Sequence, residues 1–217
     1  MEIRADLNVT ACVPREEFAW VASPLPGVDR VMLDRVGAEV AVATSIVRYA
    51  PGSQFDAHGH ALGEEFIVLD GVFSDEHGDF PAGSYVRNPP GTSHTPHSDP
   101  GCIIFVKLRQ FDEDDLTQMY TQIEPARSKA LYRYQDEVVE TVHIPAGQRH
   151  AFDASYYVRE LLVLSGSVTW QQDITRTLTP WSWIRMQPGQ PLRIVAQEDA
   201  LVFSKTRPIY REPEIQS

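Results

Sequence analysis

The sequence predicts an all-β protein made of two β-barrels in tandem, and three observations support this. Short runs rich in β-branched and aromatic residues recur along the chain, among them VAVATSIVRYA, EFIVLDG, CIIFVKL and ALVFSKT. The chain has 16 prolines and 13 glycines, and they separate these runs at nearly regular intervals. This alternation is typical of β-sandwiches and barrels. The third observation is that the two halves resemble each other.

Two pairs of motifs carry the internal repeat. EEFIVLDG, which ends at Gly71, is echoed by RELLVLSG, which ends at Gly166. SYVRNPPG is echoed at nearly the same offset by SWIRMQPG. A repeat of this size indicates two copies of one barrel. We therefore expect a first barrel over residues 1–112 and a second over residues 126–211.

One segment has a helical pattern. EDDLTQMYTQI, at residues 113–123, begins with acidic residues and is soon followed by Pro125. Acidic side chains in a first turn favour a helix. We expect a short helix here, at the join between the halves.

Composition and charge exclude several classes of function. Hydrophobic residues make up 42% of the 217 residues and charged residues 23%, as in ordinary globular proteins. The net charge of −11 disfavours nucleic acids and anionic membranes as partners. No apolar run approaches the roughly 20 residues that span a bilayer. The first residues, MEIRADLNVT, lack the apolar core of a secretory signal. We expect a cytoplasmic protein.

The two cysteines, Cys12 and Cys102, fit neither a metal-ligand spacing nor a disulfide framework. Cys102 lies in the apolar run CIIFVKL, so we expect it in the core.

Four residues form a candidate metal site. In a strand, residues two apart share a face, so His58 and His60 can both point into a barrel. Glu64 has the same parity and joins them if the strand resumes after Gly63. A Pro-Pro-Gly turn would bring His94 onto a neighbouring strand. Three imidazoles and one carboxylate suit zinc, iron, nickel or manganese.

Each of these histidines alone is more often structural than a ligand. Together, three histidines beside a glutamate inside a barrel would need other partners to offset their desolvation. We therefore predict one divalent ion, with zinc favoured and iron, nickel or manganese as alternatives.

The residues around this site resemble the two cupin motifs. GSQFDAHGHALGEEFIVLDG matches G-x5-H-x-H-x3-E-x6-G, and PPGTSH matches the second motif as far as its histidine. Ser98 stands where that motif usually has asparagine. The resemblance implies a bicupin of two double-stranded β-helix (jelly-roll) barrels. It also implies that the metal ligands are His58, His60, Glu64 and His94.

The first half is similar, more narrowly, to the cupin-like sensory domain of ChrR-type anti-sigma factors. ATSIVRYAPGSQFDAHGH and the segment from GEEFIVLDG to NPPGTSH carry this resemblance. In those proteins a helical zinc domain with an H-x3-C-x2-C pattern holds the sigma factor. This sequence has no such pattern. The resemblance therefore implies the sensory barrel, and it leaves sigma-factor binding doubtful.

The second barrel lacks the ligand set. The residues that align with the four ligands are Asp153, Ser155, Arg159 and Leu192. A leucine binds no metal, and an arginine repels one. We expect a degenerate, metal-free barrel with a structural or dimer-forming role.

We expect no direct role in metal binding for the remaining polar and aromatic candidates. Glu65 has the opposite strand parity to Glu64 and should face away from the site. His97 is a weaker candidate for a pocket residue, and His143 and His150 are ordinary residues. We expect the polar hairpin SDEHGD to be solvated; it contains Asp75, Glu76, His77 and Asp79. Tyr85 and Phe66 are expected in the core.

Three functions fit the ligand set. A cupin dioxygenase would bind O2 and a diketone-like or aromatic substrate at open metal positions, with Glu64 as a displaceable ligand or base. A sensor would hold zinc in a closed site. It would respond to a small molecule or an O2-derived species and signal oxidative stress to a transcription-regulating partner. In a third option the metal only stabilises the fold. A homodimer is expected, because barrel edge strands often pair between subunits.

Overall fold

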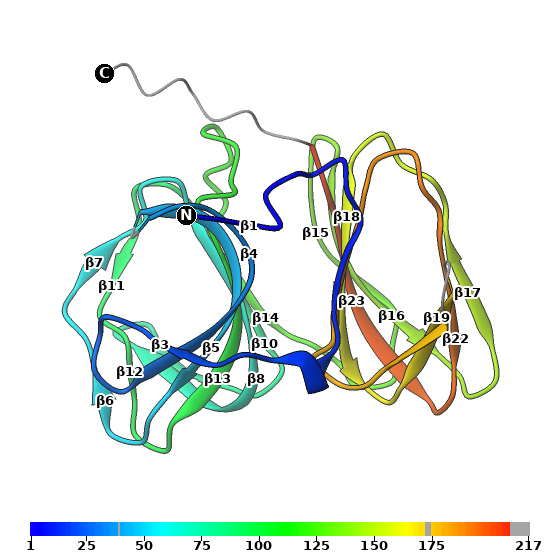
Figure 1. The fold of residues 1–217 in the computed structure, drawn as a ribbon. Helices are drawn as coiled ribbons and strands as arrows, with labels where there is room; N and C mark the ends of the chain where they lie inside the picture. Colours follow the sequence, from blue (N-terminus) through cyan, green and yellow to red (C-terminus); the bar gives the residue numbers. More distant parts are fainter. Residues whose placement is uncertain (39, 172–174, 209–217) are drawn as a thin grey trace. The chain divides into compact units, whose positions relative to one another are not determined.

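The computed structural model describes residues 1–38, 40–171 and 175–208. Within these ranges the chain forms 23 β-strands and one short 3-10 helix, η1 (Arg15–Glu17). The chain divides into two compact units, each built from β-strands (Figure 1). The predicted all-β fold is therefore confirmed. None of the described helices is long and apolar enough to cross a membrane.

The first unit contains Met1–Ala5 and Phe18–Glu124. Its main sheet has the order β1-β4-β5-β13-β8-β10-β14. These strands are β1 (Glu2–Ile3), β4 (Val28–Gly37), β5 (Ala41–Tyr49), β13 (Cys102–Leu108), β8 (Glu64–Asp75), β10 (Ser84–Asn88) and β14 (Met119–Gln122). Shorter strands complete the unit: β3 (Val21–Ala22), β6 (Ser53–Gln54), β9 (Gly78–Pro81), β12 (His97–Ser98), and the pair β7 (His58–Gly59) and β11 (Ser93–His94).

One buried apolar cluster of the first unit lies on one face of this sheet. Alternate residues of β8, including Phe66 and Val68, pack there with Val86 and Val106 from neighbouring strands. Cys102 belongs to the same buried cluster, as predicted. Period-two alternation brings Glu64, at the start of β8, onto this inner face.

The second unit contains Asp6–Glu17 and the chain from Pro125 onward. One sheet has the order β15-β16-β23-β18-β21-β2, and a second has the order β17-β22-β19-β20. The strands of the first sheet are β15 (Lys129–Tyr134), β16 (Glu137–Ile144), β23 (Ala200–Arg207), β18 (Val158–Ser165), β21 (Trp183–Met186) and β2 (Ala11–Val13). Those of the second are β17 (Arg149–Phe152), β22 (Leu192–Ala196), β19 (Val168–Gln171) and β20 (Thr175–Leu178). A buried apolar cluster fills this unit.

The units differ from the predicted ranges 1–112 and 126–211 at both ends of the first barrel. Asp6–Glu17 belongs to the second unit because β2 pairs with β21, with Cys12 opposite Ile184. The first unit continues to Glu124 because β14 pairs with β10, with Tyr120 opposite Val86. The internal repeat does not predict where β2 and β14 pair, because neither strand belongs to the repeated motifs.

The helix predicted over residues 113–123 is wrong. The segment makes turns and then forms β14. Asp112 accepts a hydrogen bond from the backbone N–H of Asp114 at 3.0 Å, and Asp115 accepts one from Thr117 at 3.3 Å. Aspartates that bond the backbone two residues on favour turns over helix.

The internal repeat is visible at two matching glycines. Gly71 lies within β8 with φ of 73°, and Gly166 directly follows β18 with φ of 69°. A Cβ atom at either position would collide with a backbone carbonyl oxygen, that of Gly101 or Asp199. Both positions therefore require glycine for the same two reasons, its left-handed φ and its lack of a side chain.

Candidate metal centre

Three short segments of the first unit position the predicted ligands. β7 and β11 pair so that His58 lies directly opposite His94. His60 follows β7, and the chain then turns at Gly63, whose φ is 78°. A side chain at Gly63 would overlap the ring of Phe111. This turn starts β8 at Glu64 with its carboxyl group toward the three imidazoles.

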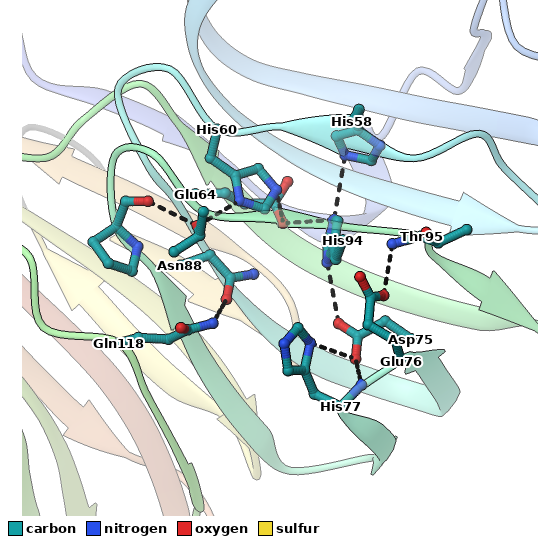
Figure 2. Close-up of polar contacts among 12 residues, drawn as sticks. His58, His60, Glu64, Asp75, Glu76, His77, Asn88, His94, Thr95 and Gln118 are labelled. Carbon is teal, nitrogen blue, oxygen red and sulfur yellow. Dashed lines mark hydrogen bonds and ion pairs between the residues drawn. The ribbon is translucent and has the colours of Figure 1, made fainter.

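The four predicted ligands converge on one point (Figure 2). One ligand atom from each of His58, His60, Glu64 and His94 lies within 4.8 Å of the others. The Nε2 atoms of His58 and His94 are 3.2 Å apart. The Glu64 Oε1 atom lies 3.7 Å from His60 Nε2 and 3.6 Å from His94 Nε2. Three of the residues are buried, and His58 is exposed.

The second ring nitrogen of each histidine lies against an oxygen atom. These contacts run from Nδ1 of His58 to Asp56 O at 3.2 Å, of His60 to Thr92 Oγ1 at 2.9 Å, and of His94 to Asp75 Oδ2 at 3.1 Å. A ring whose Nδ1 donates a hydrogen bond presents the lone pair of Nε2. All three Nε2 atoms are the ones that face the common point.

The tautomer of His60 follows from its partner. The Thr92 hydroxyl donates to Pro89 O at 2.7 Å, so it can only accept from His60 Nδ1. His60 Nε2 then carries a lone pair, and no described residue forms a hydrogen bond with this buried atom. A lone pair facing a carboxylate is unfavourable unless a cation lies between them. This donor set therefore fits a divalent metal ion.

Protonation of the four groups depends on burial and on their mutual charges. Burial, with the charges of His94 and His58, lowers the pKa of His60 to about 4. Burial raises the pKa of Glu64, although both histidines oppose this. Burial also disfavours the protonated form of His94, but the hydrogen bond to Asp75 and the charge of Glu64 outweigh it and raise the pKa of His94.

Asp75 contacts one of the predicted ligands, and the sequence prediction placed it wrongly. It was expected to be solvated, but it is only 8% exposed and bonds His94. The backbone N–H of His77 donates to its other carboxyl oxygen at 2.8 Å. The register between β8 and β13 shifts between Ile103 and Ile104. This irregularity reverses strand parity along β8, so Phe73 and Asp75 turn inward beyond it. Glu76, His77 and Asp79 are exposed, as expected.

Glu65 faces away from the ligands, as its parity predicted. Its carboxyl group accepts hydrogen bonds of 2.9 Å from both Tyr85 and Arg87. Tyr85 is fully buried and Phe66 belongs to the core cluster, as expected. His97 is half-buried and pairs with Gln54 on β6, outside the ligand group.

The corresponding place in the second unit has different chemistry. Phe152 on β17 lies opposite Leu192 on β22, as His58 lies opposite His94. The carbonyl of Ser155 accepts from Gly189 N at 2.7 Å, and that of His60 accepts from Gly91 N at 3.0 Å.

This pairing corrects one aligned position. Phe152, not Asp153, takes the place of His58, because one extra residue separates it from Ser155. Arg159 donates to Ser204 Oγ at 3.1 Å, and its guanidinium lies 5.0 Å from the centre of the Phe152 ring. Among the described residues, no group of potential metal ligands occurs in this unit.

Several solved structures of known proteins have a similar fold. Bacterial pirin YhhW from Escherichia coli, in complex with nickel(II), has 14% identity and a TM-score of 0.69 over 92% of this chain and 99% of that one. Protein Ylba from E. coli has 14% identity and a TM-score of 0.71, over 96% and 95%. A single-residue variant of salicylate 1,2-dioxygenase from Pseudoaminobacter salicylatoxidans has 10% identity and a TM-score of 0.61, over 88% and 75%. At these identities the likeness shows a shared cupin-type β fold.

Sequence comparison gives a narrower result for the first half of the chain. No curated protein matches the sequence. One family model, described as the ChrR Cupin-like domain, matches residues 8–112, which include all four converging side chains. Residues 8–112 are therefore similar in sequence to the ChrR Cupin-like domain, and the solved structures agree with this match in fold.

Proposed function

We propose that the first barrel binds one divalent metal ion through His58, His60, Glu64 and His94. The observation that carries this proposal is the orientation of the imidazoles. Each Nδ1 lies against a fixed oxygen, and each Nε2 faces the Glu64 carboxyl group. A barrel interior without an ion would leave the buried His60 Nε2 without a partner. Zinc, iron, nickel and manganese all accept this donor set.

The protein's own residues would prepare the site for such an ion. Asp75 orients His94 and holds a negative charge beside it. Thr92 fixes the tautomer of His60. When bound, a divalent ion supplies Lewis-acid polarisation of a ligand oxygen. The exposed position of His58 leaves one side of the cluster open to solvent.

We propose that the main role of this site is that of a sensory or binding module. The match of residues 8–112 to the ChrR Cupin-like domain supports this role. A small molecule or an O2-derived species that reaches the cluster would change how the ligands are held. A partner that regulates transcription would then read this change.

A metal-dependent dioxygenase is the second candidate, and one observation favours it. A cavity of about 410 Å³ lies beside the cluster, and both Asp75 and Asn88 line it. A cavity of this size accommodates a small substrate. In that case Glu64 would serve as a displaceable ligand or as a base.

Metal analysis and oxygen uptake together separate these roles. The protein, purified without a chelating tag, is analysed for bound metals by mass spectrometry. Oxygen consumption is then recorded with β-diketones and hydroxylated aryl ketones. About one zinc per chain without oxygen uptake supports the sensory role and contradicts the dioxygenase. Iron, nickel or manganese with turnover contradicts a purely sensory role. Absence of any stoichiometric metal contradicts both.

A further inference from the structure

The cavity beside the metal ligands lies entirely within the first unit and has two kinds of wall. Its polar members are Asp75, His77, Asn88 and Gln118, and its apolar members are Phe80, Val86, Met119 and Tyr120. Figure 2 shows Asn88 with Gln118 on one side and Asp75 with His77 on the other, below His94. Two of the polar residues therefore contact both the cavity and the ligand cluster.

Asn88 has an unused hydrogen-bond donor in this cavity. Its side chain is only 5% exposed, and its Oδ1 accepts from Gln118 Nε2 at 3.3 Å. Strand pairing sets Asn88 directly opposite Glu64, and a side-chain hydrogen bond from its amide opposes the rise in the pKa of that carboxyl group. This contact is longer or less linear than a normal hydrogen bond, and among the described residues no other group accepts from the buried Nδ2, which has two N–H donors. Buried donors in proteins are rarely left unpaired, which points to a missing acceptor.

The apolar walls favour an aromatic ring. The rings of Phe80 and Tyr120 lie edge to face, with centroids 5.8 Å apart. Tyr120 is 73% exposed, which is unusual for a large aromatic side chain next to a cavity. Aromatic rings attract a third ring in offset or edge-to-face contact. No lysine or arginine is among the described residues that line the cavity, whereas the carboxyl group of Asp75 is. These walls disfavour an anion.

We propose that this cavity binds a neutral aromatic compound with a carbonyl or hydroxyl oxygen. The oxygen accepts the hydrogen bond from Asn88 Nδ2, and the ring packs against Phe80 and Tyr120. This proposal rests on the proposed function, because it places the oxygen next to Glu64 and the metal ligands. It adds the chemical class of the ligand and names Asn88 as the residue that selects it.

The second barrel supports the special role of Asn88. The residue at its place in the repeated motif SWIRM is Met186, which is 3% exposed and packs in the apolar core. The matching position therefore holds an apolar side chain where no ligand set exists. Of these two matching residues, the polar one is in the barrel that has the converging imidazoles.

The test uses two probes of similar shape, acetophenone and ethylbenzene, which differ in the carbonyl oxygen. Their dissociation constants are measured by ligand-observed NMR on the metal-loaded full chain. The variants are Asn88→Ala, which removes the donor, and Tyr120→Ala, which removes one aromatic wall. Tyr156→Ala is the matched control, since Tyr156 is 94% exposed and lies in the second unit. Metal content is measured for every variant.

We expect wild type to bind acetophenone more tightly than ethylbenzene. Asn88→Ala should weaken acetophenone binding about three- to tenfold and leave ethylbenzene binding unchanged. Tyr120→Ala should weaken both probes, and Tyr156→Ala neither. Equal binding of the two probes by wild type, or an equal effect of Asn88→Ala on both, overturns the proposal.

Two further outcomes keep this proposal separate from the metal site. If wild type holds about one metal per chain but does not bind acetophenone, the ligand class is wrong and the metal site stands. If wild type holds no metal, the proposed function itself fails. If Asn88→Ala loses its metal, the effect of Tyr120→Ala on acetophenone binding becomes the test. Unchanged acetophenone binding in Tyr120→Ala then overturns the proposal.

Discussion

The two barrels place the same pair of strand positions opposite each other and fill them with opposite chemistry. In the first barrel the pair is His58 and His94, and in the second it is Phe152 and Leu192. Glu64 in the first corresponds to Arg159 in the second. The first barrel thus has imidazole nitrogens and a carboxyl group at this place. The second barrel has two apolar side chains and the guanidinium group of Arg159 there.

This difference concerns what fills the same place in each barrel. The second barrel has a continuous apolar core that reaches Phe152 and Leu192. The first barrel ends its apolar core at Phe73 and Phe80 and continues with polar residues. Buried polar groups need partners, so the proposed metal ion would be needed in the first barrel and not in the second.

Substitution of His60 should have the largest effect on metal binding by the first barrel. His60→Ala removes the buried ligand whose Nε2 has no other partner, so bound metal should fall from about one per chain to nearly none. Metal content by mass spectrometry checks this. Asp153→Ala, in the second barrel, is the control and should leave the content at one. Loss of metal in the control would show that the second barrel also contributes ligands.

Removal of the metal should destabilise the first barrel selectively. An ion present at about a thousand times its dissociation constant contributes about 4 kcal/mol to the free energy of unfolding. Scanning calorimetry with and without a chelator measures this. We expect one part of the unfolding transition to move to lower temperature and the part that belongs to the second barrel to stay. An unchanged profile would contradict a metal in the first barrel.

Substitution of Asp75 should weaken metal binding without abolishing it. Asp75→Asn removes the carboxyl group that bonds His94 Nδ1, and the loss of such support typically costs about 10- to 100-fold in metal affinity. A competition titration against a chromogenic chelator measures the affinity. Glu76→Gln is the matched control, because Glu76 is exposed and bonds only the backbone of Thr95 among the described contacts. Equal losses in both variants would argue against a specific role of Asp75.

The change in metal affinity over one pH unit should be the smallest of these effects. His94 has a raised pKa, so in the metal-free protein it holds a proton that an ion must displace. Affinity should therefore increase with pH, by at most about tenfold per unit for one proton, until His94 is deprotonated without metal. His60 adds nothing above pH 5, since its pKa is about 4. The same titration at pH 6, 7 and 8 checks this, and a flat profile contradicts it.

Strand parity and motif spacing predict much of this molecule. The runs around Phe66 and Val106 form the expected strands, and the parity of His58, His60 and Glu64 predicts their convergence. These features depend on period-two alternation, which is local in sequence.

The failures arise where distant segments pair or where a strand is irregular. The pairing of β2 with β21 and of β14 with β10 joins segments that carry no repeat signal. The irregularity in β8 turns Asp75 inward against simple parity, and an extra residue before Ser155 places Phe152 where Asp153 was expected. Such insertions shift side chains between faces, and single-sequence patterns do not reveal them.

X-ray absorption spectroscopy of the metal-loaded protein is the decisive measurement for the metal site, because it reports the atoms bound to the ion. We expect three imidazoles and at least one carboxylate oxygen around the ion, at about one metal per chain. A shell with fewer than three imidazoles, or with sulfur from Cys12 or Cys102, would contradict it.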